Sequence, residues 1–190
     1  MNSQNRSRRT VFEGTTRRDF CQVSAKAMAA VAAPTVIAAS ALGRGAKVAP
    51  SERITIGMIG IGRQARAYNL PWFLKSVETQ VVAVCDVDTT RRLDGKRIVD
   101  ERYANTDCAA YGDHQELLAR EGLDAVVIAT PDHWHANQII DSSRAGMDIY
   151  CEKPLTVTLR EAQVVVEIVS KHNRVFQTGS QQRTEFCNRF

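Results

Sequence analysis

From Ser51 onward the chain alternates short, continuous apolar runs with longer helix-like segments. The apolar runs are rich in Val and Ile and do not alternate with polar residues, which is typical of parallel strands buried on both faces. The pattern predicts an α/β fold with a doubly wound parallel sheet and helices on both faces. The expected strands are residues 53–59, 80–85, 123–129, 147–151 and 175–178, with a weak strand near 108–111.

Helix-start signals separate these strands. An N-cap residue accepts a hydrogen bond from a free amide of the first helical turn, and an acid three residues later can return one to the cap. The expected caps are Asp113 with Glu116, Asp132 alone, and Thr158 with Glu161.

Composition excludes several classes of protein. The chain is 44% hydrophobic and 24% charged, as in an ordinary soluble domain, and its five Cys contain no C-x-x-C pair that would indicate a zinc module. Residues 1–50 hold eight Lys and Arg against two acids, whereas residues 51–190 hold seventeen against nineteen. The basic excess therefore belongs to the leader, and we expect no nucleic-acid partner for the folded part.

The first 50 residues have the layout of an export signal followed by a short linker. Arg17 and Arg18 precede a weakly apolar stretch at residues 23–42, and Ala39-Ser40-Ala41 offers a cleavage site of small residues. The leader resembles the twin-arginine type, although Cys21 and Gln22 replace its usual Leu and Lys. A retained membrane anchor is the alternative. We expect a periplasmic or exported protein, with no stable membrane insertion once the signal is cleaved.

A glycine-rich loop follows the first expected strand directly. In a G-x-G-x-x-A loop the first glycine permits a tight turn, the second lets bare backbone approach a pyrophosphate, and the alanine lets helix and strand pack closely. The pyrophosphate would lie at the N-terminus of a helix that starts near Arg63, whose guanidinium could add a charge contact. The loop is Gly60-Ile61-Gly62-Arg63-Gln64-Ala65, a weak signal when taken alone.

Asp86 closes the second expected strand, where an acid can accept both hydroxyls of the adenosine ribose. Like charges about 5 Å apart repel by about 3 kcal/mol at an effective dielectric constant of about 20, before screening. The carboxylate would therefore disfavour the 2′-phosphate of NADP, so we expect NAD as the cofactor and NADP less readily. The alternative is that Asp86 is a turn residue and Asp88 a helix cap.

Two further strands end in polar clusters at the edge where open α/β sheets bind ligands. The expected strand at residues 123–129 is followed by Thr130-Pro131-Asp132-His133-Trp134-His135, and the one at residues 147–151 by Glu152-Lys153-Pro154. Proline halts strand pairing and restricts its predecessor, which fixes both clusters at the edge of the crevice.

The glycine loop, Asp86, the T-P-D-H-W-H run and the E-K-P run, in this order and spacing, resemble the Gfo/Idh/MocA oxidoreductases, the family of glucose-fructose oxidoreductase and inositol 2-dehydrogenase. The resemblance extends from Arg53 to Arg183. It implies a Rossmann domain in which Glu152 contacts the nicotinamide ribose, while Thr130, Pro131 and His135 line the path to the nicotinamide. The implied cofactor-binding residues are Gly60, Ile61, Gly62, Arg63, Gln64, Asp86, Thr130, Pro131, His135, Glu152 and Lys153.

The resemblance makes Lys153 the catalytic residue, hydrogen-bonded to the substrate hydroxyl. Elementary chemistry agrees, because a lysine desolvated beside a cationic nicotinamide ring has its ammonium form disfavoured and can take part in proton transfer. Without the flanking motifs, Lys153 would be a surface cation after an edge strand.

Other reactive side chains receive less specific interpretations. We expect no metal site, because Asp132, His133 and His135 point in different directions at a helix start. His114 and His172 are expected to be solvated helix residues. Trp134 shields the nicotinamide or packs its helix onto the sheet. The thiols of Cys85 and Cys151 are expected to be buried and inert.

The resemblance also predicts the domain organisation. Residues 51–180 form the NAD(P)-binding domain, and residues 181–190 would begin a second, substrate-binding domain that is missing here. We therefore expect either a truncated product or fragment, or a chain that acts with a partner chain. The substrate cannot be identified from these residues, and a homo-oligomer is expected only with the missing domain.

The expected function is hydride transfer between NAD and a sugar or polyol hydroxyl. One alternative is an NAD-dependent glycoside hydrolase that oxidises a sugar transiently, and another is a non-catalytic NAD-binding module. A methyltransferase would share the glycine loop and the acid but would have no use for Glu152 and Lys153.

Overall fold

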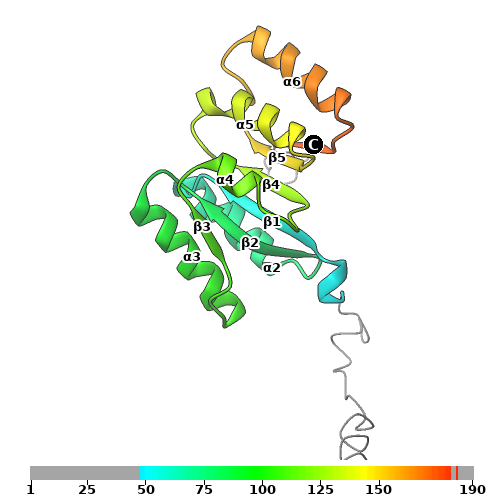
Figure 1. Cartoon of the computed structure of the whole chain (residues 1–190). Coiled ribbons are helices and arrows are strands. Elements are labelled where there is room, and N and C mark those ends of the chain that lie inside the picture. The colour runs from blue at the N-terminus through cyan, green and yellow to red at the C-terminus, as the bar shows by residue number, and fades with distance from the viewer. Residues whose placement is uncertain (1–47, 181–182, 184–190) are drawn as a thin grey trace, which may run out of the picture. The chain divides into compact units, whose positions relative to one another are not determined.

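The computed structural model describes residues 48–180 and Arg183. The expected export signal and nearly all of residues 181–190 lie outside the described residues. In chain order, the elements are η2 (Pro50–Glu52), β1 (Ile54–Ile59), η3 (Ala65–Asn69), α2 (Leu70–Lys75), β2 (Thr79–Cys85), α3 (Thr89–Tyr103), β3 (Ala109–Tyr111), α4 (His114–Leu118), β4 (Ala125–Ile128), α5 (Asp132–Arg144), β5 (Asp148–Glu152), α6 (Leu159–Lys171) and β6 (Phe176–Gly179) (Figure 1).

All six strands form one parallel sheet in the order β3-β2-β1-β4-β5-β6. The order reverses between β1 and β4, which is the switch point of a Rossmann fold. The predicted fold class is therefore confirmed. Each expected strand starts and ends within two residues of the observed one, and the weak strand near residues 108–111 is β3.

Both faces of the sheet are covered by helices, as predicted. Along each strand, neighbouring side chains point to opposite faces, so that Val126 and Ile128 join one apolar core while Val127 joins the other. The first core packs against α4, α5 and α6 through Leu117, Ile139 and Val165, and the second packs against η3, α2 and α3 through Ala65, Leu70, Leu74 and Val99.

Two of the three predicted helix caps, Thr158 and Asp113, are confirmed, but the described part of the chain shows no return hydrogen bond from Glu116 to Asp113. Thr158 and Glu161 form the reciprocal capping box, and the Asp113 carboxylate accepts a hydrogen bond from the Gln115 amide. The prediction for Asp132 was wrong. Pro131 is the N-cap of α5, because its ψ of 146° is extended and it is therefore the last residue before the helix. Asp132 is the first helical residue.

The helix after the glycine loop contains one wide turn. It runs over residues 63–75, and in η3 the Leu70 amide donates to the Ala65 carbonyl oxygen, five residues back instead of four. Pro71 gives a physical reason, because a proline inside a helix has no amide hydrogen and crowds the carbonyl four residues before it. The wide turn buries two consecutive residues, Asn69 and Leu70.

Among the residues that the structure describes, no helix has both the length and the apolar character needed to cross a bilayer. In the same part of the chain, no three His, Cys, Asp or Glu side chains converge as ligands of a metal ion would.

Candidate functional site

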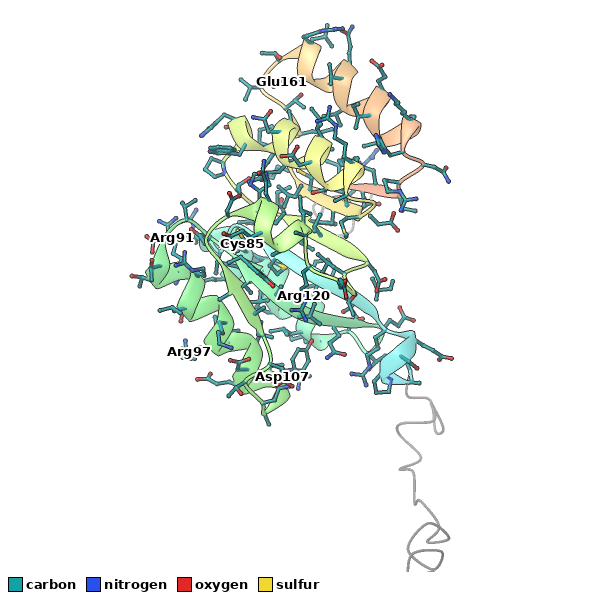
Figure 2. The ribbon with its side chains drawn as sticks, in the orientation of Figure 1. Cys85, Arg91, Arg97, Asp107, Arg120 and Glu161 are labelled. Carbon is teal, nitrogen blue, oxygen red and sulfur yellow. The ribbon has the colours of Figure 1, made fainter. Side chains whose placement is uncertain are left out.

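A cleft of about 600 Å³ lies at the carboxyl ends of β1, β2, β3 and β4, across the switch point of the sheet. Figure 2 shows two of its residues, Cys85 at the end of β2 and Arg91 in the first turn of α3. This is where open α/β sheets bind their ligands. The cleft is lined by Ile59, Gly60, Gly62, Cys85, Asp86, Val87, Arg91, Gly112, Asp113, His114, Gln115, Ala129, Thr130, Pro131, Trp134 and Gln138.

The two glycines of the loop have different structural roles. Gly60 has a φ of +88°, and a Cβ there would lie 2.9 Å from the carbonyl carbon and oxygen of Ala129, so only glycine fits. A Cβ on Gly62 would meet nothing within 4 Å. Gly62 therefore presents bare backbone to an open space directly before the helix that starts at Arg63, which suits a pyrophosphate.

Ile61 contributes to the site through its backbone. Its side chain is completely buried and packs against Gly95 of α3, where a Cβ would lie 2.9 Å from Ile61 Cγ2. The Ile61 amide donates to Asp86 Oδ2 at 2.7 Å. That amide is thus already engaged, and it fixes the glycine loop to the end of β2.

Asp86 borders the cleft and is 8% exposed. Its second oxygen, Oδ1, accepts from the Asp88 amide at 2.9 Å. A carboxylate offers about four lone-pair positions, so two remain for hydroxyl donors such as a ribose diol.

The alternative interpretation, in which Asp88 is a helix cap, also holds in the structure. Asp88 caps α3 by accepting from the Arg91 amide at 3.1 Å. That backbone hydrogen bond is the largest of the causes that lower the pKa of Asp88.

The loop after β4 forms the opposite wall of the cleft. Thr130 Oγ1 donates to Gln138 Oε1 at 2.7 Å, and Pro131 and the exposed Trp134 stand beside them. Gln138 is a lining residue that the sequence did not single out.

His114 does not match its prediction as a solvated helix residue. It lines the cleft, and its ring nitrogens lie 3.3 Å from Asp113 Oδ1 and 3.0 Å from Asp141 Oδ2. Trp134 packs edge-on against it, with ring centroids 6.5 Å apart. The prediction was wrong because Asp141 and Trp134 are distant in sequence, and only the packing of α4 on α5 brings them to His114.

His135 lies behind the cleft wall and is 1% exposed. Its Nδ1 is 2.8 Å from the Pro154 carbonyl oxygen, and its Nε2 is 2.9 Å from the Thr130 carbonyl oxygen. The imidazole thus connects the loop after β4 to the loop after β5.

Glu152 ends β5 and is 4% exposed, in a polar cluster beside the glycine loop. Its Oε1 accepts from Asn69 Nδ2 at 2.8 Å and from Gln64 Nε2 at 3.4 Å. On the other side, Gly179 lies against this carboxylate, since a Cβ there would be 3.0 Å from Glu152 Oε2. Burial, together with the Glu152 carboxylate, raises the pKa of Tyr150 to about 12.

Lys153 follows Glu152 directly and is exposed. The Lys153–Pro154 peptide bond is cis. Glu152 and Lys153 come from β5, next to β4, and are not among the residues that line the cleft itself. The predicted residues therefore form two groups, which the Gln64–Glu152 hydrogen bond and the His135 imidazole connect.

The buried cysteines match the prediction of inert thiols. Burial raises the pKa of Cys85, Cys108 and Cys151 to about 12, with a neighbouring carboxylate adding to the effect in each case. Cys85 borders the cleft, but its thiol is a poor nucleophile near neutral pH.

Known proteins resemble most of this chain. A family model described as an oxidoreductase family with an NAD-binding Rossmann fold matches residues 54–180. Inositol 2-dehydrogenase 1 of Saccharopolyspora erythraea is 30% identical over 131 residues, which are 68% of this chain and 37% of that protein. Glycosyl hydrolase family 109 protein 2 of Shewanella sp. (strain ANA-3) is 30% identical over 172 residues, covering 82% of this chain and 37% of that protein.

A solved structure shares the fold. Scyllo-inositol dehydrogenase from Lactobacillus casei, with bound NAD(H) and scyllo-inositol, superimposes with a TM-score of 0.64 at 22% identity, over 70% of this chain and 38% of that chain. The present chain spans little more than a third of the length of these proteins. The family model covers most of the chain and names the cofactor that the glycine loop and Asp86 predict. The chain therefore belongs to the Gfo/Idh/MocA oxidoreductase family, and residues 54–180 are its NAD-binding Rossmann domain.

Proposed function

We propose that this protein is an NAD-dependent oxidoreductase that transfers hydride between nicotinamide and a hydroxyl group of a sugar or polyol. One observation carries the proposal: the parallel sheet places Glu152 and Lys153, at the carboxyl end of β5, on the same edge as the cofactor cleft, and Gln64 of the glycine loop donates to Glu152 there. The named activity of the inositol dehydrogenase relative supports a polyol substrate.

The residues present fit the dinucleotide. The bare backbone at Gly62 and the helix start at Arg63 would hold the pyrophosphate, and the free lone pairs of Asp86 would take the adenosine ribose hydroxyls. Glu152 would bind the ribose on the nicotinamide side. When bound, the nicotinamide would supply the hydride acceptor or donor.

Lys153 would hold the reacting hydroxyl and move its proton. Lys153 directly follows β5, and its side chain is exposed. It could contact a substrate without displacing Glu152, because the Glu152 carboxylate is already held by Asn69 and Gln64. An amine in this place could take the hydroxyl proton during oxidation and return it during reduction.

The decisive variant is Lys153→Ala, compared with Lys171→Ala at the exposed end of α6. NAD affinity by calorimetry should stay within about threefold for both variants, since Lys153 is proposed to act on the substrate. Turnover of a sugar and polyol panel, followed as NADH absorbance, should disappear only in Lys153→Ala. Turnover that survives in Lys153→Ala would contradict the proposed role.

An NAD-dependent glycoside hydrolase is the second candidate. The match to the Shewanella glycosyl hydrolase covers 82% of the chain, more than the family model does. This longer match supports the glycoside hydrolase as a candidate function. The two functions use the same cleft and the same lysine. Release of aglycone from glycosides without net NADH would identify the hydrolase, whereas net NADH from free polyols would identify the dehydrogenase.

The leader suggests where the protein acts. We propose that Arg17 and Arg18 direct export through the twin-arginine route, because they precede an apolar stretch and a small-residue site. That route carries folded proteins, which suits a chain that encloses a dinucleotide. Replacing both residues with Lys should keep the protein inside the cell, as judged by fractionation, and unchanged export would indicate another route.

A further inference from the structure

The Glu152 carboxylate is buried without an ion pair in the part of the chain that the structure describes. A buried carboxylate is costly unless hydrogen-bond donors compensate for the lost water. The two side-chain donors on Glu152 Oε1 are Asn69, at 2.8 Å, and Gln64, at 3.4 Å. Asn69 makes the shorter contact, and its side chain is itself only 6% exposed.

Asn69 is the last residue of the wide turn in η3, and its side chain and that of the next residue, Leu70, are both buried. Leu70 joins the apolar core with Ile56 and Met58, whereas Asn69 turns its amide to the end of β5. Wide turns of this kind occur frequently at functional sites.

The orientation of the Asn69 amide is fixed by the carboxylate. Nδ2 must face Glu152, because the reversed amide would place Oδ1 against a negatively charged oxygen. As a result, Asn69 Oδ1 is buried with no hydrogen-bond partner among the described residues.

We propose that Asn69, at the end of the wide turn of η3, is the positioning residue of the Glu152 carboxylate, so that Glu152 can receive the ribose next to the nicotinamide. This inference rests on the proposed function, since it assigns Asn69 to the same cofactor site. Asn69 acts through Glu152, because its side-chain amide donates to the carboxylate at 2.8 Å.

The test uses Asn69→Asp in the full chain, with NAD affinity measured by calorimetry from pH 6 to pH 9. Aspartate has the same shape but donates a hydrogen bond to Glu152 only when protonated, and two carboxylates in contact retain a shared proton to unusually high pH. The affinity relative to the unmodified chain should be within threefold at pH 6 and fall at least tenfold by pH 9. Tyr150 also faces Glu152 but does not titrate in this range, because its pKa is about 12.

Asn105→Asp is the matched control. Asn105 Nδ2 also donates to a carboxylate oxygen, Asp107 Oδ2, at 2.9 Å, but the pair is exposed. Figure 2 shows Asp107 at the opposite end of α3 from Arg91, far from the cleft. The affinity of Asn105→Asp relative to the unmodified chain should not change with pH.

Asn69→Ala keeps the inference testable if Asn69→Asp does not fold. It removes the donor at every pH, so NAD should bind at least tenfold more weakly throughout, with melting temperature measured alongside. Affinities within threefold of the unmodified chain at pH 9 for either variant would overturn the positioning role while leaving the proposed function intact. An unmodified chain that is folded and does not bind NAD would overturn the proposed function itself.

Discussion

Two glycines only two positions apart in sequence, Gly60 and Gly62, should respond in opposite ways to the same added methyl group. At Gly60, alanine must adopt a φ of +88° and place Cβ 2.9 Å from the Ala129 carbonyl. The left-handed conformation costs about 1–2 kcal/mol and the crowding about 1–3 kcal/mol, so Gly60→Ala should lose about 2–5 kcal/mol of folding stability. A domain of this size loses about 4 °C in melting temperature per kcal/mol, which predicts a fall of about 8–20 °C.

Gly62→Ala should leave the fold intact and impair the site. The backbone of Gly62 lies outside the left-handed region, and a Cβ there meets nothing within 4 Å, so the melting temperature should change by less than about 3 °C. The methyl group would occupy the space that a pyrophosphate needs against the amides. Hydrogen bonds to a charged group contribute about 1.5–3 kcal/mol each, so losing one corresponds to NAD binding about 10- to 150-fold more weakly.

The assay is calorimetric titration of NAD into each variant, with melting followed by circular dichroism. Gly62→Ala with undiminished NAD affinity would refute the pyrophosphate assignment. A Gly60→Ala variant as stable as the unmodified chain would refute the steric argument for the first glycine.

Four further outcomes follow from the same structure. Asp86→Asn keeps an oxygen for the Ile61 amide but removes the charge, so the ratio of NAD to NADP affinity, measured by titration, should fall at least tenfold, and an unchanged ratio would count against the ribose assignment. Cys85, Cys108 and Cys151 should resist iodoacetamide at pH 8 in the native chain, because a pKa of about 12 leaves about one thiolate in 10⁴, as peptide mass spectrometry can check. These raised pKa values stabilise the fold below pH 9, and that contribution should be lost as the pH rises toward 12 in alkaline melts. Thr158→Ala removes the acceptor of the Glu161 amide in the capping box and should cost about 1 kcal/mol, seen as a lower melting temperature.

The fold was predictable because its signals are local. Continuous Val and Ile runs identify strands buried on two faces, and glycine and cap residues mark where helices begin and end. The cap of α5 was misassigned by one residue, because a proline and an aspartate next to each other both suit a helix start and only the backbone angles decide between them.

Residues of the site could be predicted from the sequence only where they belong to a recognisable motif. The glycine loop, Asp86 and the Glu152-Lys153-Pro154 run follow strand ends and could be found by position. His114 could not, because its partners Asp141 and Trp134 come from another helix. Asn69 also escaped notice, although Pro71, two residues later, was a readable sign that the helix could not remain regular there.

Asp86 illustrates why a loss of affinity alone cannot define a binding residue in this site. Its two oxygens hold the Ile61 and Asp88 amides, so any substitution that removes both acceptors also releases the glycine loop and the start of α3. Such a variant would bind both NAD and NADP poorly, whether or not Asp86 touches a ribose. Only the negative charge of Asp86 distinguishes NADP from NAD, because repulsion of the 2′-phosphate requires an ionised carboxylate and does not depend on an intact loop. The ratio of the two affinities therefore measures the ribose contact, whereas the affinity for NAD by itself measures the contact and the architecture together.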